Sequence, residues 1–92
     1  MVIAREFHGP GWTGEQYDKL IELMGFGGHS APGVLFHWAA VTDDGVLAVD
    51  VYESADAADE LVLEKIGPLA GELGLASPDV KQYEVRGYLT PA

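Results

Sequence analysis

The sequence has no cysteine, no asparagine and only five lysine and arginine residues among its 92 residues. Without cysteine the chain can form no disulfide, and it offers neither a thiol nucleophile nor a cysteine ligand for zinc or an iron–sulfur cluster. The formal charge of −10 argues against nucleic acid and anionic membrane surfaces as partners, because both are bound by clustered cations. The run Met1 to Arg5 is too short for a secretory signal, and no apolar run approaches the length of a transmembrane helix, so we expect a cytoplasmic protein.

The length and the hydrophobic content indicate one domain, residues 1–92, with apolar surface to spare. The chain is 48% hydrophobic, and a domain of this size leaves roughly a third of its unfolded surface exposed as a monomer. We therefore expect the chain to associate with itself.

The first 25 residues carry the signals of a strand followed by a capped helix. Val2 to Phe7 is an apolar run that ends at a cluster of turn-forming residues, 8–11. Thr13 and Gln16 have the spacing of a capping box. The helix that they open is expected to stop at Gly25. Its apolar stripe consists of Tyr17, Leu20, Ile21 and Met24.

Two β-branched and aromatic runs, Val34 to Thr42 and Val46 to Ser54, predict a β-hairpin around residues 43–45. A three-residue loop that ends in glycine would place Thr42 opposite Val46. The glycine-rich stretch 25–33 precedes the hairpin; it follows a helix instead of a strand and lacks the third glycine of a dinucleotide fingerprint, so we interpret it as a flexible connection or lid.

The second half of the chain predicts another helix and a last strand. Ser54 is the expected N-cap, and Pro68 predicts a kink or break at Gly67–Pro68, because proline removes a backbone hydrogen bond. The last strand is expected from Val80 to Leu89. The apolar stripe of the helix consists of Val62, Ile66, Leu69 and Leu73.

The element order β-α-β-β-α-β predicts an α+β fold of the ferredoxin-like plan: a four-stranded antiparallel sheet with both helices on one face. Period two divides the hairpin into two faces. The set expected under the helices is Leu35, His37, Ala39, Val41, Leu47, Val49 and Val51, and the set expected on the uncovered face is Phe36, Trp38, Thr42, Val46, Asp50 and Tyr52. An open aromatic face is poorly soluble, so we expect it to meet a second copy in a homodimer.

The element order and two stretches of sequence resemble the dimeric α/β-barrel superfamily, near the antibiotic-biosynthesis-monooxygenase-like proteins. The first stretch, Val49 to Ser54, passes from a strand into the second helix, and the second, Ile66 to Leu69, lies within that helix. The resemblance implies two sheets packed face to face and a pocket between sheet and helices or at the barrel mouth. The superfamily includes cofactor-free oxygenases of polycyclic aromatic substrates, haem-degrading monooxygenases and lactone isomerases.

The chain departs from the haem-degrading members of that superfamily. Those proteins use an asparagine on the first strand, a tryptophan near the end of the third and a haem-ligating histidine on the second helix. This chain has no asparagine, carries Tyr52 at the tryptophan position and has no histidine after His37. We therefore expect no haem chemistry. The histidines also lack a metal-binding spacing, so we expect neither a metal site nor another cofactor.

Asp50 is the sharpest candidate for a catalytic residue. A carboxylate between Val49 and Val51 on a central strand costs several kcal/mol unless it is paired. Its functional interpretation is a general base strengthened by removal from water. Its structural interpretation is a backbone hydrogen bond or an ion pair, and the two arginines, Arg5 and Arg86, fall on the first and last strands.

The aromatic residues and the histidines have two interpretations each. Phe36, Trp38 and Tyr52 could form a platform for an aromatic ligand, with the Tyr52 hydroxyl orienting a substrate oxygen, or they could be the dimer core. His37 is either a second catalytic residue or a hydrogen-bonded core histidine. Arg5 or Arg86 would favour a phenolate or enolate if either reached the pocket. His8 and His29, in loops, are either mobile acid/base groups or solvated side chains.

These observations predict a small cofactor-independent enzyme that acts on an apolar or aromatic metabolite and is monooxygenase-like by resemblance. The base would be Asp50 or His37, acting on a phenol or an activated C–H group. The alternative is a non-catalytic ligand-binding or structural homodimer. An enzyme needs Asp50 or His37 within reach of a cavity, whereas a structural dimer would have a fully satisfied Asp50 and solidly packed aromatics.

Overall fold

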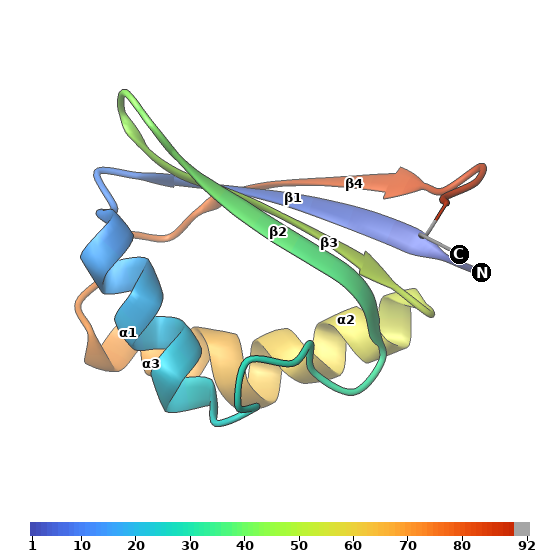
Figure 1. Cartoon of the computed structure of the whole chain (residues 1–92), viewed down its shortest axis with the longest axis horizontal. Helices are drawn as coiled ribbons and strands as arrows, with labels where there is room; N and C mark the ends of the chain where they lie inside the picture. Colours follow the sequence, from blue (N-terminus) through green and yellow to red (C-terminus); the bar gives the residue numbers. More distant parts are fainter. Residues whose placement is uncertain (90–92) are drawn as a thin grey trace.

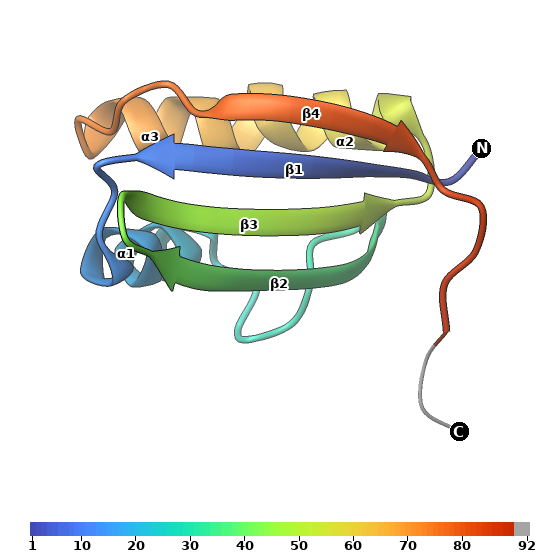
Figure 2. The same cartoon turned by 90° about the horizontal axis from the view of Figure 1, so that it is seen from above.

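One antiparallel sheet carries both helices on the same face. The computed structural model describes residues 1–89, so residues 90–92 of the expected domain lie outside the described part. The strands are β1 (Ile3–Pro10), β2 (Val34–Thr42), β3 (Gly45–Tyr52) and β4 (Asp79–Glu84), in the order β2-β3-β1-β4. Figure 1 shows α1 (Gly14–Met24) and a second, longer helix below the sheet, and Figure 2 shows the opposite face, which no helix covers. The ferredoxin-like α+β fold expected from the sequence is confirmed.

The capping box at the start of α1 is confirmed. The Thr13 hydroxyl accepts a hydrogen bond from the Gln16 backbone N–H at 3.1 Å, and the Gln16 side-chain oxygen accepts one from the Thr13 N–H at 2.9 Å. Gly25 ends the helix with φ of 79°, a left-handed conformation that glycine adopts without strain. The helix buries Leu20 and Met24 against the sheet.

The second helix runs from residue 55 to residue 72, so of the kink or break expected at Gly67–Pro68 the break does not occur, and a π-helical turn precedes the proline. It consists of α2 (Ala55–Leu61), the π-helical turn η1 (Val62–Ile66) and α3 (Gly67–Glu72). In the π turn the Gly67 N–H donates to the Val62 carbonyl, five residues back. This wider turn makes room for the Pro68 ring, which in a regular helix would clash with a carbonyl four residues back.

The hairpin has a different register from the one expected, and this exchanges the two faces of one of its strands. Thr42 pairs with Gly45 instead of Val46, so the loop has two residues instead of three. Gly45 belongs to β3 and not to the turn: a Cβ atom there would lie 2.0 Å from the carbonyl oxygen of Gly9 on β1. The glycine is therefore needed for close packing between strands.

The shifted register exchanges the two faces of β3 relative to β2, because successive side chains of a strand point to opposite sides. His37 lies opposite Asp50, and Trp38 lies opposite Val49. Asp50 and Tyr52 therefore face the helices and not the open side, which corrects the expected division of the hairpin. The open face carries Phe36, Trp38, Ala40, Leu47, Val49 and Val51 from the hairpin, and from β1 and β4 it carries Ala4 and Tyr83 together with the charged Glu6 and Lys81.

The last strand, β4, is shorter than expected. It ends at Glu84 instead of Leu89, and the chain then leaves the sheet (Figure 2). The reason is that β1 begins at Ile3, so the pairing stops where the Val85 N–H reaches the Val2 carbonyl at 3.1 Å. Arg86 therefore lies outside the sheet and is exposed. In residues 1–89 no helix is both long and apolar enough to span a bilayer.

Candidate functional site

A cavity of about 100 Å³ lies between the sheet and the helices, and its walls are mostly apolar. The sheet contributes small or apolar side chains from β1 and β3, and α1 contributes one apolar side of the helix. The glycine-rich stretch 25–33 closes part of the cavity. The apolar side chains among the lining residues are Phe7, Trp12, Leu20, Ile21, Met24, Phe26, Ala31, Val34, Val46, Ala48, Leu61, Ile66 and Pro78.

Four polar side chains form a continuous hydrogen-bonded chain beside this cavity, which we call the relay: Tyr17, His37, Asp50 and Tyr52. The Tyr17 hydroxyl contacts His37 Nε2, and His37 Nδ1 contacts Asp50 Oδ1. The Tyr52 hydroxyl donates to Asp50 Oδ2 at 2.7 Å. The Tyr17 and His37 rings are nearly parallel, with an interplanar angle of 10°. Tyr17, His37 and Asp50 line the cavity.

The hydrogen bonds fix the tautomer of neutral His37. Asp50 is 6% exposed, and its carboxylate only accepts hydrogen bonds. Its two oxygens therefore require two donors, which are the Tyr52 O–H and the His37 Nδ1–H. With its proton on Nδ1, His37 presents a lone pair at Nε2, and the Tyr17 hydroxyl donates to it. No buried side-chain nitrogen or oxygen within residues 1–89 lacks a partner.

The environment holds both tyrosines in their protonated forms. Burial raises the pKa of Tyr17 above its ordinary value of 10.0, and the negative charges of Asp50 and Asp18 raise it further. Burial also raises the pKa of Tyr52, and the charge and hydrogen bond of Asp50 add to this effect, while the positive charge of Arg5 opposes it. Both hydroxyls therefore remain donors over the whole neutral range.

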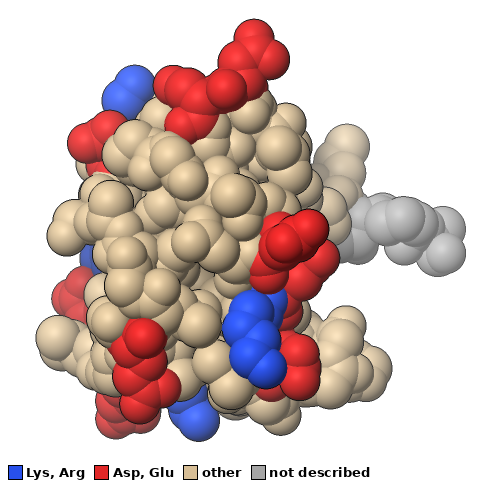
Figure 3. Space-filling model, turned by 90° about the vertical axis from the view of Figure 1, so that its left-hand side faces the viewer, with Lys and Arg blue, Asp and Glu red and all other residues tan. Residues whose placement is uncertain are grey.

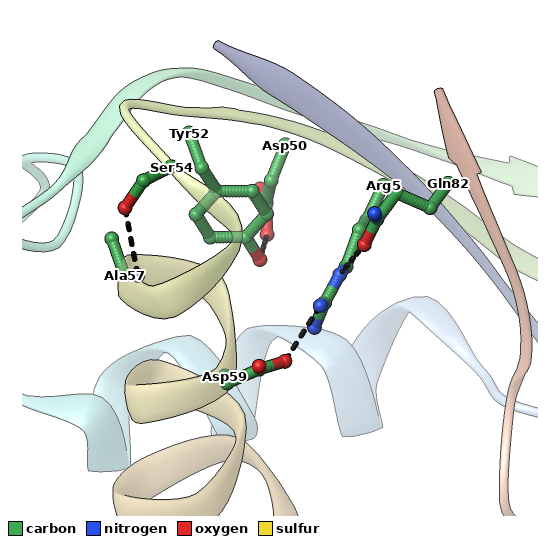
Figure 4. A network of polar contacts seen from close by, with 7 residues as sticks. All are labelled: Arg5, Asp50, Tyr52, Ser54, Ala57, Asp59 and Gln82. Carbon is green, nitrogen blue, oxygen red and sulfur yellow. Dashed lines mark hydrogen bonds and ion pairs between the residues drawn. The ribbon is translucent and has the colours of Figure 1, made fainter. Parts of the chain in front are cut away.

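Arg5 is held outside the relay. Its Nη2 contacts Asp59 Oδ1 on α2 at 2.6 Å, and its Nε donates to the Gln82 side-chain oxygen on β4 at 2.9 Å. Figure 4 shows Arg5 extending between β4 and α2, while the Tyr52 ring and Asp50 lie beside each other. The ion pair expected between Asp50 and an arginine is therefore not formed: His37 and Tyr52 take the place of the arginine.

The raised pKa values of the tyrosines predict a weaker fold in alkali. Above about pH 10 the unfolded chain releases these protons and the folded chain keeps them, so stability that is complete below pH 10 falls as the pH rises. Tyr52→Phe removes one such group. We therefore expect the free energy of unfolding of this variant to fall less steeply with pH, by about 1.4 kcal/mol per pH unit above pH 10. Urea unfolding at several pH values measures this slope. Equal slopes in the two proteins would contradict the prediction.

The structure brings together both catalytic candidates and separates the substrate-binding ones. Asp50 and His37 contact each other and line the cavity. Phe36 and Trp38 lie on the open face, 50% and 42% exposed, and are not among the cavity-lining residues. Tyr52 lies on the opposite face and is fully buried. The single aromatic platform expected from these three residues is therefore not present.

Of the remaining candidates, Arg5, Arg86 and His8 lie away from the cavity wall and His29 lies on it. Arg5 and Arg86 are not among its lining residues, since Arg5 pairs with Asp59 and Arg86 follows the end of β4. His29 does line the cavity, from the glycine-rich stretch. His8 contacts Asp44 Oδ1 at 3.1 Å, away from that cavity.

Sequence reasoning missed Tyr17 as a functional residue. It occupies the apolar stripe of α1, where a tyrosine is usually read as core. A signal was nevertheless present, because a buried tyrosine hydroxyl needs a polar partner and His37 was expected on the face beneath the helices. That pairing would have pointed to Tyr17.

No family model matches the sequence, and no curated protein matches it either. Solved structures match its fold over almost the whole chain. A Chloroflexus aurantiacus protein, provisionally assigned as an antibiotic biosynthesis monooxygenase, has a TM-score of 0.68 at 18% identity, covering 98% of both chains. The chain has the fold of the antibiotic biosynthesis monooxygenases.

Two further structures with this monooxygenase fold come from Streptomyces. SnoaB of Streptomyces nogalater, a cofactor-independent oxygenase, has a TM-score of 0.61 at 17% identity, covering 98% of this chain and 96% of SnoaB. The ActVA-Orf6 monooxygenase of Streptomyces coelicolor, solved with nanaomycin D, has a TM-score of 0.51 at 24% identity, covering 99% of this chain and 92% of that one. The likeness to antibiotic-biosynthesis-monooxygenase-like proteins expected from the sequence is thus confirmed for the fold.

Proposed function

We propose that this chain is a cofactor-independent enzyme that removes a proton from an apolar aromatic metabolite and oxygenates it. The observation that carries the proposal is the opening of the His37–Asp50 pair into a mostly apolar cavity. A convergent polar pair in an apolar pocket is the usual form of a small-molecule site. The fold shared with SnoaB, a cofactor-independent oxygenase, supports the same reaction class.

In this proposal His37 is the base and Asp50 is the anion that orients it. The Asp50 carboxylate holds the Nδ1 proton of His37, so that Nε2 is the nitrogen that accepts a proton, and it stabilises the imidazolium that forms. Removing a proton from a phenol or an activated C–H group makes the substrate electron-rich. Such an anion can react with dioxygen directly. A C–O bond forms at a ring carbon, the C–H hydrogen of that carbon and the phenolic proton leave with the second oxygen atom as water, and the phenol becomes a quinone, so no outside reductant is consumed.

We further propose that the working unit is a homodimer formed through the open face. Phe36 and Trp38 are half-exposed there, beside apolar residues of β3. An apolar sheet face of this kind is a typical protein contact. Phe36 and Trp38 would then belong to the subunit interface and not to the ligand site.

The alternative function is a binding protein without catalysis, and one observation favours it. Both oxygens of Asp50 already have hydrogen-bond partners, as a purely structural carboxylate would. The two functions make the same prediction for ligand binding and different ones for turnover, so both must be measured.

Filling the cavity from α1 tests the location of the ligand. Ile21 lines the cavity and is 36% exposed, whereas Leu23 on the same helix is 40% exposed and is not among the lining residues. We expect Ile21→Trp to weaken the binding of polycyclic phenols at least tenfold, because the larger side chain occupies the ligand's volume. The matched variant Leu23→Trp should change the affinity less than twofold. Fluorescence titration measures both, and equal affinities would place the ligand elsewhere.

Oxygen consumption tests the reaction. An oxygen electrode, with polycyclic phenols and hydroquinones as substrates and no added cofactor, should show uptake that depends on the protein. If ligands bind but no substrate of the set causes oxygen uptake, the oxygenase function is excluded and the non-catalytic binding function is retained.

A further inference from the structure

His37 cannot reach a ligand with its basic nitrogen while the relay is intact. Its Nδ1–H is given to Asp50, and its Nε2 lone pair is taken by the Tyr17 hydroxyl. A proton that leaves a ligand in the cavity must therefore arrive first at the Tyr17 oxygen, or Tyr17 must move away.

We propose that Tyr17 is the catalytic residue that meets the substrate and that the substrate class is a phenol or enol, neutral on entry, whose acidic O–H hydrogen-bonds to the Tyr17 oxygen. This inference rests on the proposed function and deepens it. It assigns the contact with the ligand to a residue of α1, and it gives His37 the task of storing the proton.

The burial of the four side chains gives the relay a direction. Tyr52 is fully buried and Asp50 is 6% exposed, so that end is closed. The Tyr17 and His37 side chains are only partly buried and line the cavity. A ligand therefore approaches the relay from the Tyr17 end.

The proton transfer balances within the chain. The substrate O–H bond breaks and its proton binds to the Tyr17 oxygen, while the original Tyr17 proton moves to His37 Nε2. Tyr17 is neutral before and after the transfer. The products are a substrate anion and an imidazolium, which pairs with the Asp50 carboxylate. Burial and the Asp50 charge raise the pKa of Tyr17, which keeps the hydroxyl protonated at rest.

The chemistry of the cavity favours a weak acid over a permanent anion. Its walls are apolar, and the chain carries a formal charge of −10. A carboxylate would lose its hydration on entry and would be repelled at long range. A phenol enters uncharged, and its negative charge appears only when a cation forms at His37.

The test uses 7-hydroxycoumarin, a bicyclic phenol whose neutral and anionic forms absorb at different wavelengths. Absorbance titration of the bound probe gives its apparent pKa in the cavity, and fluorescence gives its affinity. In the unmodified protein we expect the bound probe to be at least tenfold more ionised than in Tyr17→Phe at the same pH. We expect the two affinities to agree within about threefold, because Phe keeps the ring and removes only the oxygen.

Tyr88→Phe is the matched control, since Tyr88 is 47% exposed and is not among the cavity-lining residues. It should behave as the unmodified protein does. If Tyr17→Phe binds the probe and ionises it equally, the inference about Tyr17 is overturned and the proposed function stands. If the unmodified protein does not bind the probe, both the aromatic-ligand function and this inference fail.

Discussion

Asp50→Asn is expected to lower turnover by about 10⁴-fold and to leave the chain folded, the size of effect known for the same change in a Ser-His-Asp triad. The asparagine oxygen can still accept from the Tyr52 hydroxyl, but its amide N–H₂ then faces His37 Nδ1. The histidine would adopt the other tautomer, with its proton on Nε2. The hydrogen bond to Tyr17 would reverse, and His37 could no longer accept a proton there.

Asp59→Asn is the matched control for this substitution. Asp59 also pairs with a cation, but its side chain is 57% exposed and lies on the outer side of Arg5. We expect it to leave turnover unchanged within about twofold. Steady-state oxygen consumption measures both variants, and urea unfolding should show that Asp50→Asn loses about 1–3 kcal/mol. Unchanged turnover together with that loss of stability would assign Asp50 a structural role.

Trp38→Glu is expected to convert the protein from a dimer into a monomer. A stable dimer through the open face would bury at least about 1,200 Å² in total. Two-fold symmetry would bring both new carboxylates into that interface, where they lose water and lie beside the apolar side chains of Phe36 and Val49. The chain already has a surplus of acids, and Figure 3 shows acidic groups, with a few basic ones, over the side of the molecule that lies at the left of Figure 1. Light scattering at micromolar concentration measures the mass.

Leu63→Glu is the control for the dimer prediction. Leu63 is 75% exposed on the π turn of the second helix, on the layer opposite the open face. The charge change is the same, and we expect this variant to stay dimeric. A monomeric mass for the unmodified protein, or a dimer of Trp38→Glu, would rule out the open face as the interface.

The fold was predictable because several local signals agree. The capping box of Thr13 and Gln16, the N-cap at Ser54 and the two hairpin runs each specify an element, and their order allows few arrangements. At Pro68 the local signal was correct, since the backbone does depart from a regular helix there. Its result is a π turn and not a break, because packing of the long helix on the sheet favours continuity.

The site was predictable only in part because its geometry depends on one residue of register. Gly45 was read as a turn glycine, whereas the structure uses it where β3 passes close to the Gly9 carbonyl. Asp50 and His37 were therefore identified as candidates but expected on opposite faces. No local pattern specifies contacts between strands that are distant in sequence, so the exchange of Tyr52 and Asp50 to the helix side could not be derived.

Of the three hydrogen bonds in the relay, one joins the two layers of the fold. Asp50, His37 and Tyr52 all come from the sheet, and Tyr17 alone comes from a helix. The Tyr17 backbone N–H donates to the Thr13 carbonyl at 3.0 Å, so the first turn of α1 sets the height of its hydroxyl above the sheet. The same cap that starts a helix thus also determines whether the proposed proton path is connected. Fraying of that single turn would disconnect the proposed path and remove Tyr17 from the cavity wall, while the sheet and the His37–Asp50 pair stayed in place.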